Sequence, residues 1–467
     1  MPLVRFPLFL FCICFFNLLT AHARLSAAEG ADSIVVLLSV DGLANFYLDD
    51  PKADIPVLRQ LMKDGVRAAS MKPSMPTVTW PNHTTLVTGV HPGTHGVLGN
   101  TVLDRTTGEH VQLMVDPIYN KDEIVRSPTI YDVAKGAGMK TAALIWPATR
   151  GATTLDWTVP DVGSLDLVKK YATPSLLKEF GEAGIPWEMQ EEWWAAKRIR
   201  ERDGMFVAMA KHVITRHRPQ LLLMHLVELD HVQHVGGPQT PEAYDALKAA
   251  DTRVGEIQAH LQKSHPGRAT LLVVSDHGFF PFQQSIWLNV LLKQERLLMA
   301  IGGKITKARV RTVAQGGACF VYILDTENRA PLLETMTAKL KDVEGVARII
   351  QPAEFAAFGL GDPAQNPQVP DLVVSAKSGY SFFDSPGGDV VVKPKDEKLR
   401  GTHGYDMNEP AMQATFIAWG AGIEKDAKLG AISNTSVAPT LAALLGLKMK
   451  DVDGPVPEEL LQVKAAE

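Results

Sequence analysis

The sequence predicts an α/β protein in which a mostly parallel central sheet is covered by helices on both faces. Three continuous apolar runs, at residues 33–40, 220–226 and 270–275, have the length and composition of strands buried on both faces. Helical patterns alternate with these runs along the chain, and this order favours βαβ units. Each run ends in acidic or histidine residues, so polar side chains should collect at one edge of the sheet.

The other expected elements follow the same alternation. Strands are expected at residues 33–40, 140–146, 220–226, 270–275 and 414–419. Helices are expected at residues 55–64, 129–137, 191–216, 241–262 and 434–445. We interpret residues 31–280 and 401–447 as one core.

Residues 281–400 do not follow this alternation of strands and helices. They contain a helical pattern near residues 287–298, a strand-like apolar run at 318–324, and loops rich in glycine and proline. We interpret them as an inserted cap region. With 467 residues, the chain can form one large domain with insertions or two domains.

The N-terminal segment has the pattern of a secretory signal. Arg5 precedes an apolar run at residues 6–19, and the small-x-small sequence Ala21-His-Ala23 follows. We expect a signal peptide at residues 1–23 and an exported protein, periplasmic or secreted. The run is short for a membrane span, although an uncleaved anchor is the alternative. No later stretch is apolar enough to span a membrane, so we expect no stable membrane insertion after cleavage.

The number of cysteines and the net charge limit which cellular compartment and which binding partners are expected. Cleavage would remove Cys12 and Cys14 and leave only Cys319, which we expect to be a buried thiol. The mature chain would then form no internal disulfide, and this fits a bacterial periplasm better than a disulfide-rich extracellular setting. The net charge of −5 argues against a surface that coats nucleic acid.

The segment around Thr79 is the most informative stretch. Pro76 and Pro81 flank Thr79, and the run after Pro81 looks helical up to Gly89, a good C-terminal cap. Thr79 should therefore lie at or just before a helix N-terminus, where free backbone N–H groups attract a phosphate. Thr79 is our candidate nucleophile. The alternative is that Thr79 only caps the helix and that Pro81 is its first residue.

Carboxylates and histidines follow the buried strands and precede the strand at residues 414–419. They are Asp41, Asp230, His234, Asp276, His277 and His403. Three carboxylates and three histidines together suit zinc, which accepts both oxygen and nitrogen ligands. Each motif alone could be a turn, but chance hardly explains all of them at one sheet edge beside a hydroxyl. His83 and His91 are expected to hold backbone groups near Thr79, and His231 to point elsewhere.

The combination of motifs resembles one known family. The motifs are Asp41-Gly, Pro76-Thr-Val-Thr-Trp-Pro-Asn-His83, Val87-Thr-Gly, His95-Gly-Val-Leu-Gly-Asn100, Asp230-x-x-x-His234, Ser275-Asp-His-Gly278, Thr402-His-Gly404 and Ala438-Pro-Thr-Leu-Ala-Ala-Leu-Leu-Gly446. The chain is similar to the nucleotide pyrophosphatase/phosphodiesterases, or type I phosphodiesterases, of the alkaline-phosphatase-like superfamily. The similarity runs from about residue 34 to 447 and is weakest at 281–400. It implies an alkaline-phosphatase-like catalytic core.

The resemblance implies two zinc ions and a set of roles. One ion would be bound by Asp230, His234 and His403. The other would be bound by Asp41, Asp276 and His277, together with the Thr79 hydroxyl. Asn100 and a backbone N–H near Trp80 would stabilise the phosphoryl oxygens. Trp80, where the family usually has Phe or Tyr, would form a wall that stacks a nucleobase, or else would pack into the core.

The expected function is hydrolysis of nucleotide phosphodiester or phosphoanhydride bonds through a covalent threonine intermediate. The expected partner is a small phosphodiester, most simply a nucleotide. One alternative is hydrolysis of a C–P bond, as in phosphonoacetate hydrolases, and another is a phosphodiesterase of phospholipid head groups. A sulfatase is disfavoured because no Cys/Ser-x-Pro-x-Arg signature surrounds Thr79. A binding protein on an inactive scaffold should have lost ligands, yet every expected ligand is present.

Overall fold

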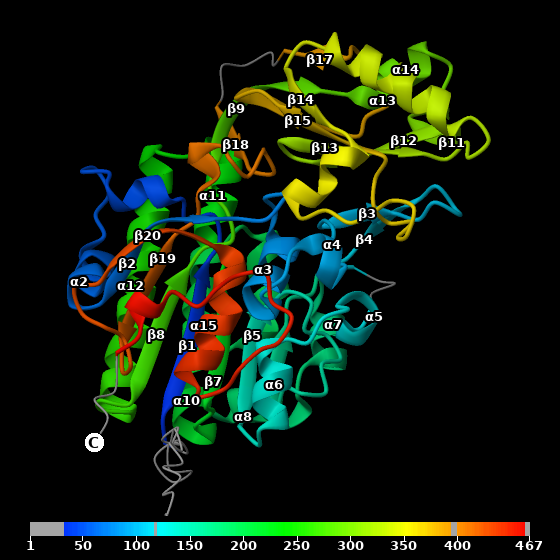
Figure 1. Ribbon diagram of the computed structural model, residues 1–467. Helices are drawn as coiled ribbons and strands as arrows, with labels where there is room; N and C mark the ends of the chain where they lie inside the picture. Colours follow the sequence, from blue (N-terminus) through cyan, green and yellow to red (C-terminus); the bar gives the residue numbers. More distant parts are fainter. Residues whose placement is uncertain (1–31, 116–118, 394–398, 463–467) are drawn as a thin grey trace, which may run out of the picture.

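The computed structural model describes residues 32–115, 119–393 and 399–462. The expected signal peptide at residues 1–23 lies outside these ranges. Figure 1 shows a large sheet flanked by helices, with a smaller lobe above it that is built mainly from the inserted region.

Eight strands form the large sheet in the order β20-β2-β19-β8-β1-β7-β5-β6. Their bounds are β1 (Ile34–Val40), β2 (Val66–Lys72), β5 (Thr141–Trp146), β6 (Trp157–Pro160), β7 (Leu221–Leu226), β8 (Ala269–Val274), β19 (Phe416–Gly420) and β20 (Lys428–Ser433). All neighbours are parallel except β19, which is antiparallel to both β2 and β8. The predicted fold class is therefore confirmed.

Helices cover both faces because the central strands are apolar on both sides. In β1, Val36 and Leu38 belong to one apolar cluster, whereas Val35 and Leu37 belong to another on the opposite face. The helices that pack into the first cluster include α2 (Pro56–Asp64), α10 (Ile199–His217) and α12 (Pro241–Ser264). Those that pack into the second are α3 (Thr79–Thr88), α6 (Ile130–Gly136) and α15 (Val437–Leu444).

Several element boundaries differ from the sequence expectation. The long helix expected at residues 191–216 is two helices, α9 (Gln190–Ala195) and α10. Between them Lys197 adopts a left-handed φ of 57°, and the Arg198 N–H donates to the Trp193 carbonyl at 2.7 Å, which closes a turn. Strand β2 was not expected, because its polar and partly exposed sequence lacks the apolar run of a buried strand.

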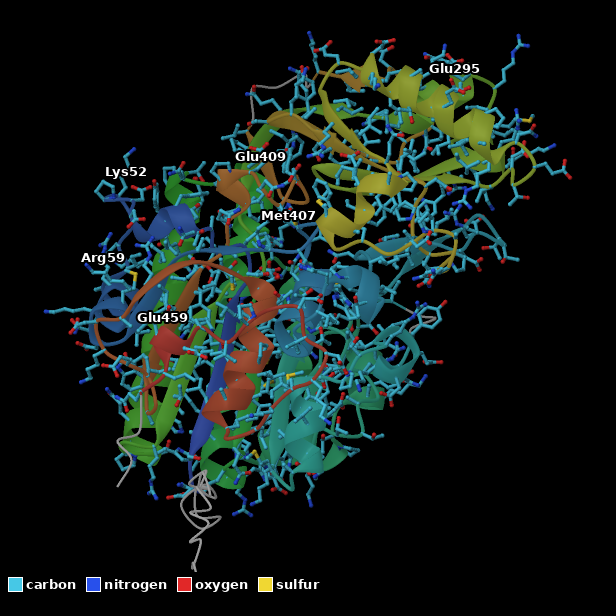
Figure 2. The ribbon with its side chains drawn as sticks, in the orientation of Figure 1. Lys52, Arg59, Glu295, Met407, Glu409 and Glu459 are labelled. Atoms are coloured by element: carbon cyan, nitrogen blue, oxygen red, sulfur yellow. The ribbon has the colours of Figure 1, made fainter. Side chains whose placement is uncertain are left out.

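The inserted residues form sheets of their own. The antiparallel sheet β12-β13-β15-β14 has the bounds β12 (Val310–Gln315), β13 (Ala318–Ile323), β14 (Val346–Ile350) and β15 (Leu372–Ala376), and α14 (Arg329–Lys341) packs on it. Cys319 in β13 is buried, as expected. Met75 and Leu98 share an apolar cluster with Phe320 and Met407. The smaller lobe is therefore packed against the part of the molecule that contains the large sheet. Figure 2 shows Met407 between the two parts and Glu295 far out on the lobe.

The strand order places the polar strand ends together. Strands β8, β1 and β7 are adjacent and parallel, so their carboxyl ends meet at one edge of the sheet. Asp41 follows β1, helix α11 (Glu228–Gly236) follows β7, and Asp276 with His277 follows β8. Within the described ranges, none of the helices combines the length and the apolar character needed to cross a bilayer.

Candidate active site

Two groups of metal-capable side chains lie at this edge. Asp41, Asp276 and His277 form the first group, and Asp230, His277 and His403 form the second. Within each group, the atoms that could bind a metal all lie within 4.8 Å of one another. The imidazole of His277 stacks on that of His403, with 3.7 Å between the ring centroids, so the two groups adjoin.

In the first group the contacts are short and the side chains are buried. His277 Nε2 lies 3.0 Å from Asp276 Oδ2 and 3.4 Å from Asp41 Oδ1. The Gly42 N–H donates to Asp276 Oδ1 at 3.2 Å, which links the ends of β1 and β8. Gly42 has a φ of 67°, and a Cβ there would lie 2.9 Å from the Phe279 ring, so glycine is required directly after Asp41.

In the second group Asp230 lies on α11 and His403 follows β18 (Arg400–Thr402), and His234, which is not one of the three, lies beside Asp230. Asp230 and His234 lie one turn apart on α11 and face the same side, with Nε2 and Oδ2 separated by 3.4 Å. They are thus held on a helix and not in a solvated turn. His403 Nε2 lies 3.7 Å from Asp230 Oδ1. Gly404, with φ 92°, lets the chain turn there, because a Cβ would lie 1.8 Å from the Gln315 carbonyl oxygen.

All three histidines are oriented in the same way. The Nδ1 atom of each lies within hydrogen-bond distance of a backbone carbonyl, at 3.0 Å for His234 with Gly401, 3.1 Å for His277 with Gly278, and 3.0 Å for His403 with Thr77. Each Nδ1 therefore carries the proton, and each Nε2 lone pair faces the site. This tautomer is the one that metal-binding histidines adopt in proteins.

Buried atoms without hydrogen bonds mark the place of a cation. Asp41 Oδ1, Asp230 Oδ1, Asp276 Oδ2 and His277 Nε2 are all buried and lack a hydrogen-bond partner. Burial, reinforced by the Asp276 and Asp230 carboxylates, raises the pKa of Asp41 well above its usual value. Unpaired buried carboxylates are costly unless a cation neutralises them, so this donor set fits divalent metal.

Thr79 is the first residue of α3. Val78 occupies the capping position without a side-chain hydrogen bond, and Pro81 is the third helical residue. The alternative in which Thr79 caps the helix and Pro81 begins it is therefore wrong. The Thr79 side chain lines a cavity of about 450 Å³ together with Asp41 and Asn100. The hydroxyl thus opens into the same space as the metal-capable residues.

Asn100 is held by the backbone of α3. The Trp80 N–H donates to Asn100 Oδ1 at 2.8 Å, and Asn100 lines the cavity, where its amide N–H groups can donate to a ligand. The Trp80 N–H is therefore engaged by Asn100, and the role of a backbone N–H near Trp80 toward a phosphoryl oxygen stays a prediction.

Trp80 does not form a cavity wall. Its side chain is only 2% exposed and packs against Val97, Leu113, Val125 and Ala148. A side chain buried in this way offers no face to a base, so the expected stacking role of Trp80 is wrong and the core-packing alternative is correct.

A different tryptophan faces the cavity. Trp194 in α9 lines it and is 50% exposed, and Met114 and Val115 line it as well. The Arg202 guanidinium lies 4.9 Å from the centre of the Trp194 ring, and the His231 ring lies 5.3 Å from it, edge-on. His231 therefore points away from the metal-capable groups, as expected, but into the substrate cavity.

A carboxylate and a guanidinium, those of Asp161 and Arg202, lie on the same cavity wall. Burial raises the pKa of Asp161 to about 6, and the opposing charge of Arg202 limits that rise. Both residues line the cavity. No sequence motif contained either residue: Asp161 follows β6, and Arg202 lies in α10.

Three buried residues that support the site were also missed. His225 in β7 lies 2.9 Å from Asp41 Oδ2 through Nε2, and 3.1 Å from the Ile145 carbonyl through Nδ1. The Asp203 carboxylate accepts hydrogen bonds from the N–H groups of Val227 and Glu228 and so caps the start of α11. A histidine inside an apolar strand was the one available signal. The third is Asn82, whose side chain bonds the backbone of the turn before Thr79.

The turn before Thr79 is fixed by side-chain hydrogen bonds. Asn82 donates to the carbonyls of Pro76 and Val78, and its Oδ1 accepts from the Ser74 N–H. His83 Nδ1 lies 2.9 Å from the Thr79 carbonyl, as expected. His91, in contrast, pairs with the Ser74 hydroxyl at 2.8 Å and not with the backbone.

The model of the type I phosphodiesterase/nucleotide pyrophosphatase family matches residues 35–406. Human ectonucleotide pyrophosphatase/phosphodiesterase family member 1 is 25% identical over 88% of this chain and 40% of its own length. Venom phosphodiesterase 2 of Crotalus adamanteus is 24% identical over 89% of this chain and 46% of its own length. The chain thus spans less than half the length of these two relatives.

Solved structures show the same fold. Murine ectonucleotide pyrophosphatase/phosphodiesterase 5 superposes with a TM-score of 0.69 at 21% identity, and covers 92% of this chain and 100% of its own. An inactive form of that mouse protein, solved in complex with AMP, matches with the same TM-score at 20% identity and the same coverage. Because the family model matches most of its length, the chain belongs to the type I phosphodiesterase/nucleotide pyrophosphatase family.

Proposed function

We propose that this protein is an exported, zinc-dependent hydrolase of nucleotide phosphodiester or phosphoanhydride bonds that acts through Thr79. The observation that carries the proposal is the set of buried, unbonded metal-facing atoms that adjoins the cavity lined by Thr79. Membership of the family supports hydrolysis, and the AMP complex of the mouse relative supports a nucleotide substrate. Within the chain, we propose a catalytic core at residues 31–280 and 401–447 and a cap at 281–400.

Two zinc ions fit the donor set. Asp230, His234 and His403 would hold one ion, and Asp41, Asp276 and His277 the other. Bound metal at these places would lower the pKa of a contacting hydroxyl and neutralise charge on phosphoryl oxygens. His225 would keep the Asp41 carboxylate oriented toward its ion, since the hydrogen bond to Oδ2 leaves Oδ1 free.

The chain's own residues would perform the transfer in two steps. The Thr79 oxygen would attack phosphorus, a P–O bond to the leaving alcohol or phosphate would break, and the nucleotidyl group would remain on Thr79. Water would then break the new ester and restore the hydroxyl. The free amide N–H of Asn100 would donate to an equatorial oxygen, an interaction often worth about 3 kcal/mol in a transition state.

Trp194 would perform the base-stacking role that was predicted for Trp80 from the sequence. Its half-exposed indole faces the cavity, and Arg202 behind the ring polarises its face. A nucleobase could stack on this surface, and Met114 and Val115 would exclude water beside it.

A substrate panel tests the proposal. The zinc-loaded enzyme should be assayed with nucleotide diesters, nucleoside triphosphates, phosphocholine diesters, phosphate monoesters and phosphonoacetate. We expect the highest kcat/KM with a nucleotide diester or anhydride. A higher value with phosphonoacetate would instead assign C–P cleavage, and a higher value with phosphocholine diesters would assign head-group hydrolysis.

A further inference from the structure

A third group of metal-capable side chains lies away from the active site. Glu179 belongs to α8 (Pro174–Glu182), and His212 and His217 belong to α10. His212 Nε2 and His217 Nε2 both approach the same carboxylate oxygen, Glu179 Oε2, at 3.1 and 2.8 Å. The three ligand atoms all lie within 4.8 Å of one another.

The spacing of these atoms is close to that of a zinc site. With zinc–nitrogen and zinc–oxygen bonds of about 2.0–2.1 Å, neighbouring ligands of a tetrahedral ion lie roughly 3.3 Å apart. The observed contacts of 3.1 and 2.8 Å need to lengthen only slightly to admit an ion. Two histidines and one glutamate also form a donor set that zinc accepts in proteins.

The two imidazoles are held in place by packing. His217 stacks on Trp157 with 4.2 Å between ring centroids, and His212 meets Phe180 edge-on at 5.6 Å. The side chains of Glu179, His212 and His217 are between 13% and 24% exposed. The group is therefore ordered by its surroundings, yet one side remains open to water for a fourth ligand.

The local charges suit a cation. The Glu179 carboxylate supplies the negative charge of the group, and Nε2 of His212 and Nε2 of His217 both lie at its Oε2. Arg216 is the neighbouring positive charge and opposes the ion.

This group is separate from the candidate active site. His217 ends α10 just before β7 begins at Leu221, whereas the active-site residues follow the carboxyl ends of the strands. Figure 1 shows α8 and the lower end of α10 at the opposite end of the sheet from α11 and β18. The inference therefore does not depend on the proposed function.

We propose that Glu179, His212 and His217 bind one zinc ion, with water as the fourth ligand, as a structural site that joins α8 to α10. The segment between these helices contains η2 (Trp187–Met189) and α9, and α9 carries Gln190 and Trp194 of the cavity wall. An ion at this place would restrain this segment at the end that lies away from the cavity. Without an ion, both imidazoles donate to Glu179, and the connection rests on hydrogen bonds alone.

Metal counting on the full mature chain tests the site. Wild type and Glu179→Gln should be dialysed against the same micromolar free zinc and analysed by inductively coupled plasma mass spectrometry. Because glutamine keeps the hydrogen-bond acceptor but loses the charge, Glu179→Gln should fold and bind one zinc ion fewer per chain. His260→Gln is the matched control, since His260 lies on α12 beside Thr215 of α10 but outside the group. It should bind as many ions as wild type.

A second variant keeps the test decisive. If Glu179→Gln does not fold, His212→Gln should show the same loss of one ion. A wild-type crystal measured above the zinc absorption edge should show an anomalous peak between the three side chains. An equal zinc count in wild type and in the folded variant, or an equal loss in His260→Gln, would overturn the site. Neither outcome concerns turnover, so the active-site proposal is tested separately.

Discussion

Replacing Trp194 with alanine tests which aromatic side chain the substrate meets. Trp194 lines the cavity and is 50% exposed, so its removal should leave no buried void and should cost little stability. Loss of a base-stacking surface is worth about 1–3 kcal/mol, which corresponds to a decrease of about 5- to 150-fold in kcat/KM. The circular dichroism spectrum and the zinc content should remain those of wild type.

The assay compares two substrates with the same leaving group. The p-nitrophenyl ester of thymidine 5′-monophosphate carries a base, whereas methyl p-nitrophenyl phosphate does not. Trp194→Ala should decrease kcat/KM by about 5- to 150-fold for the first substrate and by less than about 3-fold for the second, because only the first substrate has a base that can stack. Equal losses on both substrates, or no loss on either, would refute Trp194 as the stacking wall.

Three further predictions concern the buried side chains of the site. Trp80→Ala should destabilise the protein by about 3–5 kcal/mol in chemical denaturation, and should reduce turnover of the two p-nitrophenyl substrates equally; a loss confined to the nucleoside ester would contradict its core position. His225→Phe should weaken metal binding about 10- to 100-fold in chelator competition, because Asp41 loses its orienting hydrogen bond; unchanged affinity would remove His225 from the site. Asp276→Ala and His403→Ala should each lose one zinc ion and nearly all activity, as should treatment of wild type with a chelator; full metal content in both variants would contradict the ligand assignment.

The fold was predictable where the sequence is apolar over a whole element. Strands β1, β5, β7 and β8 are buried along their entire length, and their apolar runs identified them. Strand β2 has a mixed burial pattern and was not predicted. The break between α9 and α10 depends on the backbone of Lys197, a non-glycine residue with positive φ, and no sequence pattern announces such a conformation.

The site was predictable where function imposes residue type and spacing. The structure places Asp41, Asp276 and His277 together, and Asp230 beside His234 and His403, as strand ends at one sheet edge should be. The cavity wall was not predictable, because Trp194 lies on the short helix α9, whose position depends on tertiary packing. Trp80 was assigned wrongly because its place next to Thr79 says nothing about the direction of its side chain.

The central claim is that Thr79 becomes covalently modified, and one measurement tests it most directly. Wild-type enzyme mixed with a nucleotide diester should be quenched in acid within a turnover, digested, and analysed by mass spectrometry. A nucleotidyl group should appear on the peptide that contains Thr79 and should be absent from Thr79→Ala, which should fold and lose nearly all turnover. Near-wild-type turnover in Thr79→Ala, or an adduct on any other residue, would show that Thr79 is not the nucleophile.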